Sequence, residues 1–215
     1  MDIMNLLKDS FETLKKPTML VKRKDKADLT EAVKNFAIGG AIGGLIGGVL
    51  SAFFQFIMSV LSGNVVGAFF QLLLTPIFMI VFAIILAPIG NLIMNGLYYL
   101  VAKALGGKAT YAQQTYLVSI PSIVGLAISV ILSAVPFIGS FILAPLFGLY
   151  LLYITVVVIR DVHQLEIVKA AAAVILPIIA ISFVVMVLAA ILAVLFASLL
   201  GGLFVGGAAA GMYGN

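Results

Sequence analysis

Three side chains that can transfer protons or bind metals lie close together in the sequence, namely Asp161, His163 and Glu166. A carboxylate–imidazole–carboxylate set can carry out general acid–base chemistry or hold a metal ion. The alternative is a polar helix end at the membrane surface, next to Arg160 and Lys169. The chain has one His and no Cys, and the spacing matches no established metal site. We therefore favour the polar helix end and predict no enzyme, no metal and no cofactor.

A second group of polar side chains lies within apolar sequence, and its members are Asn91, Asn95, Ser119, Ser122 and Ser182. At a helical rise of about 1.5 Å per residue, Asn95 and Asn91 lie roughly 12 and 18 Å from Lys103 along the helix. The serines reach similar depths from other basic residues, so we expect one polar layer near the bilayer centre. Such a layer could line a path for a small solute, ion or lipid. It could instead hold helices together by hydrogen bonds of about 0.6 kcal/mol each, which we favour.

Glycine recurs every four residues on two adjacent faces of one apolar segment, at Gly39, Gly40, Gly43, Gly44, Gly47 and Gly48. Small residues at this spacing let another helix backbone approach closely within a membrane. The sequence therefore predicts a helix-packing surface here. We favour a partner helix in the same chain, with a second subunit of an oligomer as the alternative.

The elements that carry these residues are predicted by composition. The 215-residue chain is 64% hydrophobic and 9% charged, whereas soluble domains have roughly 45–50% apolar and about 25% charged residues. This excludes soluble and disordered classes and indicates an all-α integral membrane protein. The net charge of +4 is better explained by membrane topology than by nucleic acid, because it is so unevenly placed.

Fourteen of the 20 charged residues lie in the first 34 positions. Three charge-free stretches follow, at 36–102, 109–159 and 170–215, with room for two, two and one membrane spans. All charged residues then lie on one side of the membrane. Because positive residues mark the cytoplasmic side, we predict a cytoplasmic amino terminus and a carboxyl terminus outside.

Five spans are predicted near 36–61, 75–104, 112–134, 137–160 and 170–199. They form a helical bundle over 35–200, preceded by a cytoplasmic segment at 1–34 and followed by a glycine-rich extracytoplasmic tail at 201–215. Residues 64–75 could either extend the second span or form a separate outer helix, since Pro76 favours a break.

The amino-terminal segment combines an amphipathic helix with a basic stretch. Ile3, Leu7, Phe11 and Leu14 share one helical face, and Pro17 ends the helix. Beyond it the side chains expected to contact anionic lipid headgroups are Lys22, Arg23, Lys24 and Lys26. The segment is interpreted either as a docking surface for lipid or a cytosolic protein, or as a cover over the inner end of the bundle, which we favour.

Several short motifs follow one another in an order that resembles the Yip family, the Rab-interacting five-span membrane proteins. They are Leu14-Lys15-Lys16-Pro17, Ala102-Lys103-Ala104-Leu105-Gly106-Gly107-Lys108, Tyr111, Pro121, Gly148-Leu149-Tyr150-Leu151-Leu152-Tyr153, Val162-His163-Gln164-Leu165 and Lys169-Ala170. The resemblance covers nearly the whole chain and implies five spans.

The resemblance also implies a function. Eukaryotic relatives bind lipidated Rab-type GTPases at early secretory membranes and assist vesicle traffic. Their longer amino-terminal region, with a Tyr-Gly-Pro type motif, is missing from this chain, which argues against GTPase binding and favours a prokaryotic member in the cell membrane. We expect a non-enzymatic membrane organiser or adaptor, and the alternative is a small-solute, ion or lipid transporter using the polar layer.

Overall fold

The computed structural model describes residues 3–135 and 138–212, and its described part is helical with no strand. The elements are α1 (Ile3–Lys15), η1 (Pro17–Lys26), α2 (Leu29–Leu61), α3 (Val65–Ala104), α4 (Tyr111–Ser133), η2 (Gly139–Leu143), α5 (Ala144–His163) and α6 (Ile167–Met212). Five helices are long and apolar enough to cross a membrane, namely α2, α3, α4, η2 with α5, and α6. The predicted all-α membrane bundle with five spans is confirmed.

The chain divides into two compact units, Met1–Val174 and Ile175–Asn215. The first holds α1 to α5 with the first turns of α6. The second is the continuation of α6, which stays helical through Met212, so most of the predicted glycine-rich tail is helix. The functional residues discussed below belong to the first unit, apart from Ser182.

Local sequence explains where the first helices begin and end. Pro17 cannot continue α1, and a 3₁₀-helical segment, η1, begins there. Asp28 caps α2, because its carboxylate accepts from Thr30 N at 2.8 Å. The turn after α2 contains Gly63 with φ +81°, a conformation that other residues rarely adopt, and Asn64 then caps α3.

The third helix, α3, is one continuous helix of 40 residues with Pro76 and Pro88 inside it. Residues 65–74 therefore extend the second span and form no separate outer helix. Of the two alternatives left open by the sequence, the continuous helix is the one observed, and Pro76 does not break it. The next long helix, α4, begins at Thr110, whose side chain forms a capping box with Gln113.

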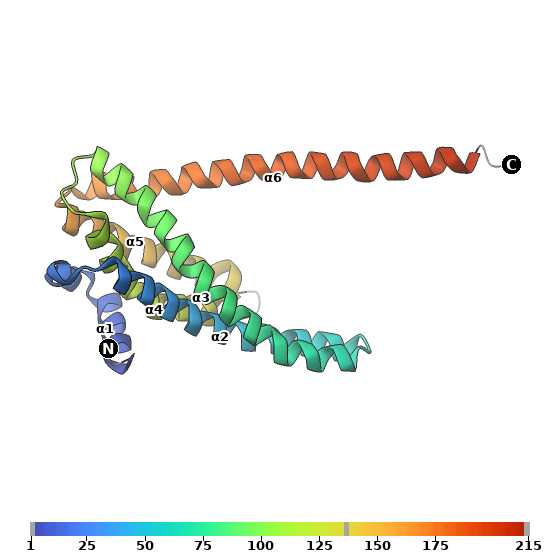
Figure 1. Cartoon of the computed structure of the whole chain (residues 1–215), viewed down its shortest axis with the longest axis horizontal. Coiled ribbons are helices and arrows are strands. Elements are labelled where there is room, and N and C mark those ends of the chain that lie inside the picture. The colour runs from blue at the N-terminus through green and yellow to red at the C-terminus, as the bar shows by residue number, and fades with distance from the viewer. Residues whose placement is uncertain (1–2, 136–137, 213–215) are drawn as a thin grey trace. The chain divides into compact units, whose positions relative to one another are not determined.

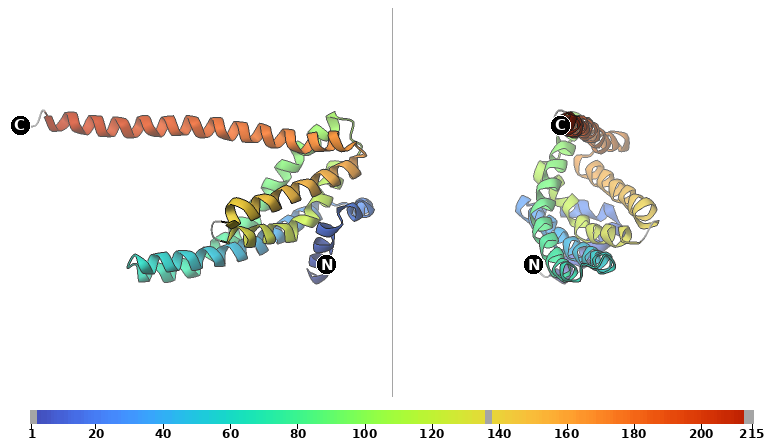
Figure 2. Two further views of the ribbon diagram at one scale, coloured as in Figure 1. Left: turned by 180° about the vertical axis from the view of Figure 1, so that it is seen from behind. Right: turned by 90° about the vertical axis from the view of Figure 1, so that its right-hand side faces the viewer.

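The glycine-rich part of α2 packs against two other helices of the same unit. A Cβ on Gly40, Gly44 or Gly48 would lie 2.4 to 2.8 Å from backbone atoms of α3, which leaves no room for a side chain. On the adjacent face, a Cβ on Gly39 would lie 3.0 Å from Ile123 Cα of α4. Figures 1 and 2 show α2 and α3 running side by side as an antiparallel pair. One glycine face thus meets α3 and the other meets α4.

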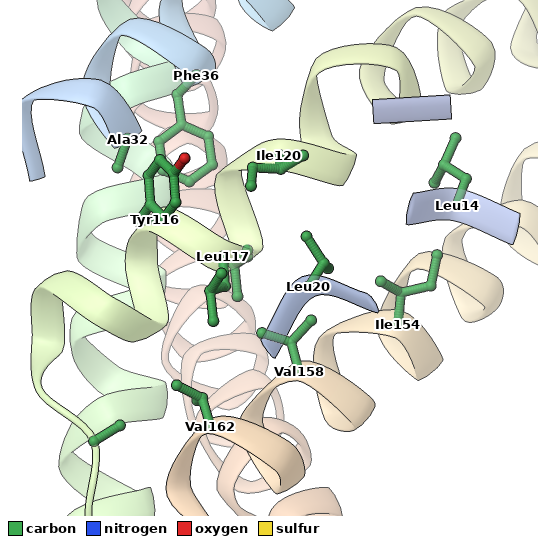
Figure 3. Close-up of a cluster of buried hydrophobic side chains, with 12 residues drawn as sticks. Leu14, Leu20, Ala32, Phe36, Tyr116, Leu117, Ile120, Ile154, Val158 and Val162 are labelled. Atoms are coloured by element: carbon green, nitrogen blue, oxygen red, sulfur yellow. The ribbon is translucent and has the colours of Figure 1, made fainter. Parts of the chain in front are cut away.

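The amino-terminal segment contributes to the hydrophobic core. A cluster of buried side chains joins it to α2, α4 and α5, as Figure 3 shows, and its members are Leu14, Leu20, Ala32, Phe36, Ala109, Tyr116, Leu117, Val118, Ile120, Ile154, Val158 and Val162. Leu20 of η1 is 0% exposed. We call the end of the unit that carries Lys103, Lys108 and His163 the basic end, and the end at the turn 62–64 the hairpin end.

Candidate functional site

A buried hydrogen-bond chain joins α3, α4 and α5 at the basic end. Gln114 Nε2 donates to the backbone oxygen of Asn95 at 2.9 Å, and Gln114 Oε1 lies 2.8 Å from His163 Nε2. Because a carbonyl oxygen can only accept, His163 Nε2 carries the proton of this contact. Gln114 and His163 are both 0% exposed. The amide of Gln114 therefore links three helices in a place that water does not reach.

The loop after α3 closes over the His163 ring. A Cβ on Gly107 would lie 2.4 Å from His163 Nδ1 and 2.7 Å from the oxygen of Ala102, so only glycine fits. Lys108 N donates to the His163 backbone oxygen at 3.2 Å, and Lys103 Nζ donates to Gly107 O at 3.2 Å. The Gly-Gly-Lys motif thus serves as a cover for a buried imidazole.

The three residues that could have formed an acid–base set have separate surroundings. Asp161 Oδ1 accepts from Arg160 Nε at 2.6 Å, His163 points to Gln114, and the Glu166 side chain is exposed. Within residues 3–135 and 138–212, no group of three or more His, Cys, Asp or Glu side chains could hold a metal ion. The arrangement is that of a polar helix end.

Three residues of the predicted polar layer line one cavity of about 210 Å³ between α3, α4 and α5. They are Asn91, Asn95 and Ser122, and the polar side chains of Tyr98 and Thr155 join them. The rest of the wall is apolar, from Met94, Val118, Pro121, Leu126, Leu151 and Ile154. A cavity therefore reaches Asn91.

The polar side chains of this cavity bond to their own helices. Asn91 Nδ2 donates to Ala87 O at 2.8 Å, and Asn95 Nδ2 donates to Asn91 O at 2.9 Å. Ser122 Oγ and Thr155 Oγ1 each donate, at 2.9 Å, to the carbonyl oxygen four residues earlier. None of these four bonds joins two helices, so they do not hold the bundle together in the way we favoured from the sequence.

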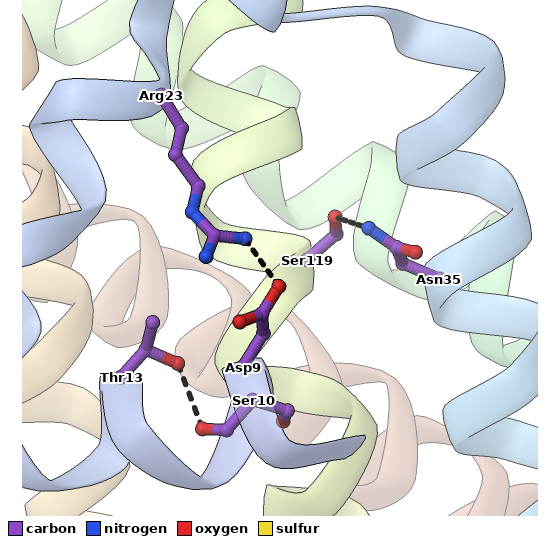
Figure 4. A network of polar contacts seen from close by, with 6 residues as sticks. All are labelled: Asp9, Ser10, Thr13, Arg23, Asn35 and Ser119. Carbon is purple, nitrogen blue, oxygen red and sulfur yellow. Dashed lines mark hydrogen bonds and ion pairs between the residues drawn. The ribbon is translucent and has the colours of Figure 1, made fainter. Parts of the chain in front are cut away.

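Ser119, by contrast, does join two helices. It accepts from Asn35 Nδ2 of α2 at 2.9 Å and donates to Tyr116 O at 2.7 Å, and Asn35 and Ser119 are both buried. Figure 4 shows this pair beside the ion pair of Asp9 and Arg23. Ser182 lies in the second unit and is not among the residues that line the cavity.

Four residues that matter here were missed by sequence reasoning: Asn35, Gln114, Tyr98 and Thr155. Asn35 and Gln114 lie near the ends of spans, close to charged residues. Polar side chains are common there, so their presence did not indicate a buried site. Thr155 had a usable signal, since it is a hydroxyl residue within an apolar run of α5. By the same helical rise it lies only roughly 7.5 Å from Arg160, which is shallower than the other members.

The amino-terminal segment is fixed to the bundle by polar contacts as well as by its core side chains. The Ser10 hydroxyl accepts from Val124 N at 3.1 Å, and Tyr150 Oη donates to Leu14 O. Among the basic residues expected at lipid headgroups, Arg23 pairs with Asp9 at 2.8 Å, and Lys24 Nζ lies 3.4 Å from Val162 O. Lys22 and Lys26 are exposed.

The ion pair between η1 and α1 also shifts proton affinity. The hydrogen bond from the Arg23 guanidinium lowers the pKa of the Asp9 carboxyl below its ordinary value, against the opposing effect of burial. The same hydrogen bond raises the pKa of Arg23. Asp9 is therefore ionised at neutral pH and holds η1 against α1.

These features define a class: an integral membrane protein built as a bundle of apolar helices, with an amphipathic amino-terminal helix packed into its core. The family is shown by comparison with known proteins, since the model of the Yip1 domain matches residues 37–189. The chain belongs to the Yip family. No curated protein and no solved structure is significantly similar to it.

Proposed function

We propose that the chain is a non-enzymatic membrane organiser or adaptor that presents its basic end to a protein partner and is linked to membrane trafficking. The observation that supports this most is the fixed amino-terminal segment. Leu20 is 0% exposed and Ser10 accepts from Val124 N, so α1 and η1 are held in place. Because the backbone that carries the charged side chains is already ordered, a partner binds without the cost of ordering this segment.

The surface available to a partner is mixed in character. Exposed side chains of α1 and η1 include Lys8, Phe11, Glu12, Lys15 and Lys22. Aromatic side chains such as Phe11 are enriched in protein-binding surfaces, and charged side chains occur at their rims. We further propose that the exposed Lys22 and Lys26 contact anionic headgroups, each contributing about 1 kcal/mol near the surface.

Membrane orientation is part of the same proposal, with the amino terminus on the cytoplasmic side of a prokaryotic cell membrane. The natural absence of Cys allows a direct test. Single cysteines in place of Gly63 or Ser133, both exposed, are expected to react with a membrane-impermeant maleimide added from outside. A cysteine in place of Lys22 is expected to react only after the cells are opened. The reverse pattern would refute the orientation.

The partner surface is tested by photo-crosslinking in intact cells. A photoreactive amino acid at Phe11 is expected to give protein adducts of defined mass, and the same group at Phe141 of η2 serves as the matched exposed control. Reversing the charge of Lys8 and Lys15 should remove the adducts formed at Phe11. Adducts with lipid alone at Phe11 would refute the proposal.

A second candidate function is transport of a small solute, ion or lipid, and it rests on the cavity that reaches Asn91. In vesicles that contain the purified protein, a transporter should lose flux when Asn91 and Asn95 become Leu while helical content is kept. An adaptor should show no flux in either form.

A further inference from the structure

The cavity between α3, α4 and α5 has a wall of distinct chemistry. Its polar side chains are two amides, two aliphatic hydroxyls and the phenol of Tyr98, and none of the residues that line it carries a charge. The cavity is large enough for more than a single water molecule. A ligand held there must therefore be recognised by hydrogen bonds without charge.

The hydrogen bonds already made determine what the wall still offers. The hydroxyls of Ser122 and Thr155 each donate their single proton to a carbonyl oxygen of their own helix. Their oxygens can therefore only accept a further hydrogen bond. Asn95 Oδ1 is buried with no hydrogen-bond partner. An unsatisfied buried acceptor costs about 1–3 kcal/mol. The wall is thus rich in acceptors, and it favours a ligand that donates through O–H or N–H.

The charge of the head group determines which membrane lipids could bind in the cavity. A phosphate removed from water needs a cationic partner, and an unpaired buried charge costs several kcal/mol. The lining residues include no Lys or Arg. An uncharged hydroxyl can be buried with far less cost once it is hydrogen-bonded. A neutral head group therefore fits this wall and a phosphorylated one does not.

The position of the cavity favours a ligand that comes from the bilayer. Helices α3 and α5 both pack against α4 but make almost no contact with each other. At the same level their outer surfaces are apolar, with Ile93 on α3 59% exposed and Leu149 on α5 62% exposed. A ligand with a polar head in the cavity could lay an acyl chain along this surface.

We propose that the cavity binds the uncharged, hydroxyl-bearing head group of a diacylglycerol-type lipid. The hydroxyl donates to the oxygens of Ser122, Thr155 or Asn95, and the acyl chains stay in the hydrocarbon. This site is separate from the surface proposed for a protein partner, and it holds whether or not the chain moves the lipid it binds.

The test uses the full-length protein in phosphatidylcholine vesicles with a photoactivatable diacylglycerol. Cross-linked peptides, identified by mass spectrometry, are expected from residues 91–98, 118–126 and 151–155. Unlabelled diacylglycerol should compete, whereas phosphatidic acid with the same acyl chains should not. This competition needs no variant, so it does not depend on whether a substitution folds.

Two variants address the hydroxyls directly. Ser122→Ala and Thr155→Val each remove one possible acceptor, and labelling is expected to fall about fivefold in the variant that loses the acceptor used by the lipid hydroxyl, as one hydrogen bond is worth about 1 kcal/mol. Ser133→Ala is the matched control, because this α4 hydroxyl also bonds to its own helix but lies outside the cavity. Equal competition by phosphatidic acid, labelling elsewhere in the chain, no labelling at all, or equal labelling of the three variants would each overturn the proposal.

Discussion

The two ends of the first unit are held together in different ways. At the basic end, large buried side chains such as Leu20 and Phe36 interlock, and Gln114 joins three helices through hydrogen bonds. Towards the hairpin end, α2 and α3 approach through glycines, and their outer side chains are exposed, with Phe54 66% and Phe70 62% exposed.

The difference follows from the solvent that each region is built for. Among lipid chains, burial of apolar side chains supplies no net drive for helix association, so backbones must come close enough for dispersion contacts. The basic end instead resembles the core of a soluble protein, where burial of large apolar side chains acts together with hydrogen bonds between helices. The chain thus combines two packing principles within the same helices.

The largest expected effect tests the side-chain packing of the basic end. Leu20→Ala should lower the free energy of unfolding by about 2–5 kcal/mol, because it empties a fully enclosed site. Met19→Ala, on the same 3₁₀ segment but 44% exposed, should change it by less than about 0.5 kcal/mol. Unfolding in detergent micelles measures both. Equal effects would show that η1 does not belong to the core.

The next effect compares the same substitution in the two regions. Gln114→Leu should cost about 2–4 kcal/mol, since it strands both the His163 Nε2 proton and the Asn95 oxygen. Gln71→Leu, which removes the part-buried bond between Ser59 and Gln71 near the hairpin end, should cost only about 0.5–1.5 kcal/mol. Both costs are measured by unfolding in detergent micelles. Equal costs would contradict the difference in packing between the two ends.

The glycine contact of the hairpin pair is tested by adding one methyl group. Gly40→Ala would place a Cβ 2.4 Å from the Ala83 oxygen, and the displacement of α3 should cost about 1–3 kcal/mol. Gly90→Ala, on α3, meets nothing within 4 Å and should be neutral or stabilising by up to about 1 kcal/mol. Melting temperatures of the two variants decide the matter, and a stable Gly40→Ala protein would contradict the close approach.

The smallest effect concerns the ion pair between α1 and η1. Because the folded-state pKa of Asp9 lies below its ordinary value of 3.8, the pair stabilises fully above that pH, and its contribution is lost as pH falls through the folded-state pKa. Asp9→Asn should therefore cost about 0.2–1 kcal/mol at pH 7 and progressively less as the pH is lowered below 3.8. Asp25→Asn, at an exposed position on η1, is the control. A cost that stays constant as the pH falls below 3.8 would rule out the ion pair as its cause.

Much of the fold could be predicted from the sequence, because charge placement and hydrophobic length are one-dimensional signals. The five spans and the helix end at Pro17 are of this kind. The doubled glycine pattern predicted a packing surface, but it did not tell which helix each face meets. That assignment depends on the tertiary arrangement, in which Gly40 meets Ala83 and Gly39 meets Ile123.

The site was harder to predict than the fold. Depth along a helix placed Asn91, Asn95 and Ser122 at one level, and they do line one cavity. The direction of their hydrogen bonds could not be read from depth, because a side chain can bond to its own backbone as well as to a neighbour. Gln114 and His163 lie 49 positions apart, and no local pattern connects them.

The packed amino-terminal segment has a consequence for the order of assembly. It is synthesised before α4 and α5, and its bonds to Val124 and Tyr150 span 114 and 136 positions of sequence. At ribosomal speeds of about 5–20 residues per second, these partners emerge on the order of 10 s later. During that interval Leu14 and Leu20 have no partner from α4 or α5, and two helical hairpins must enter the bilayer before α1 and η1 reach their final place.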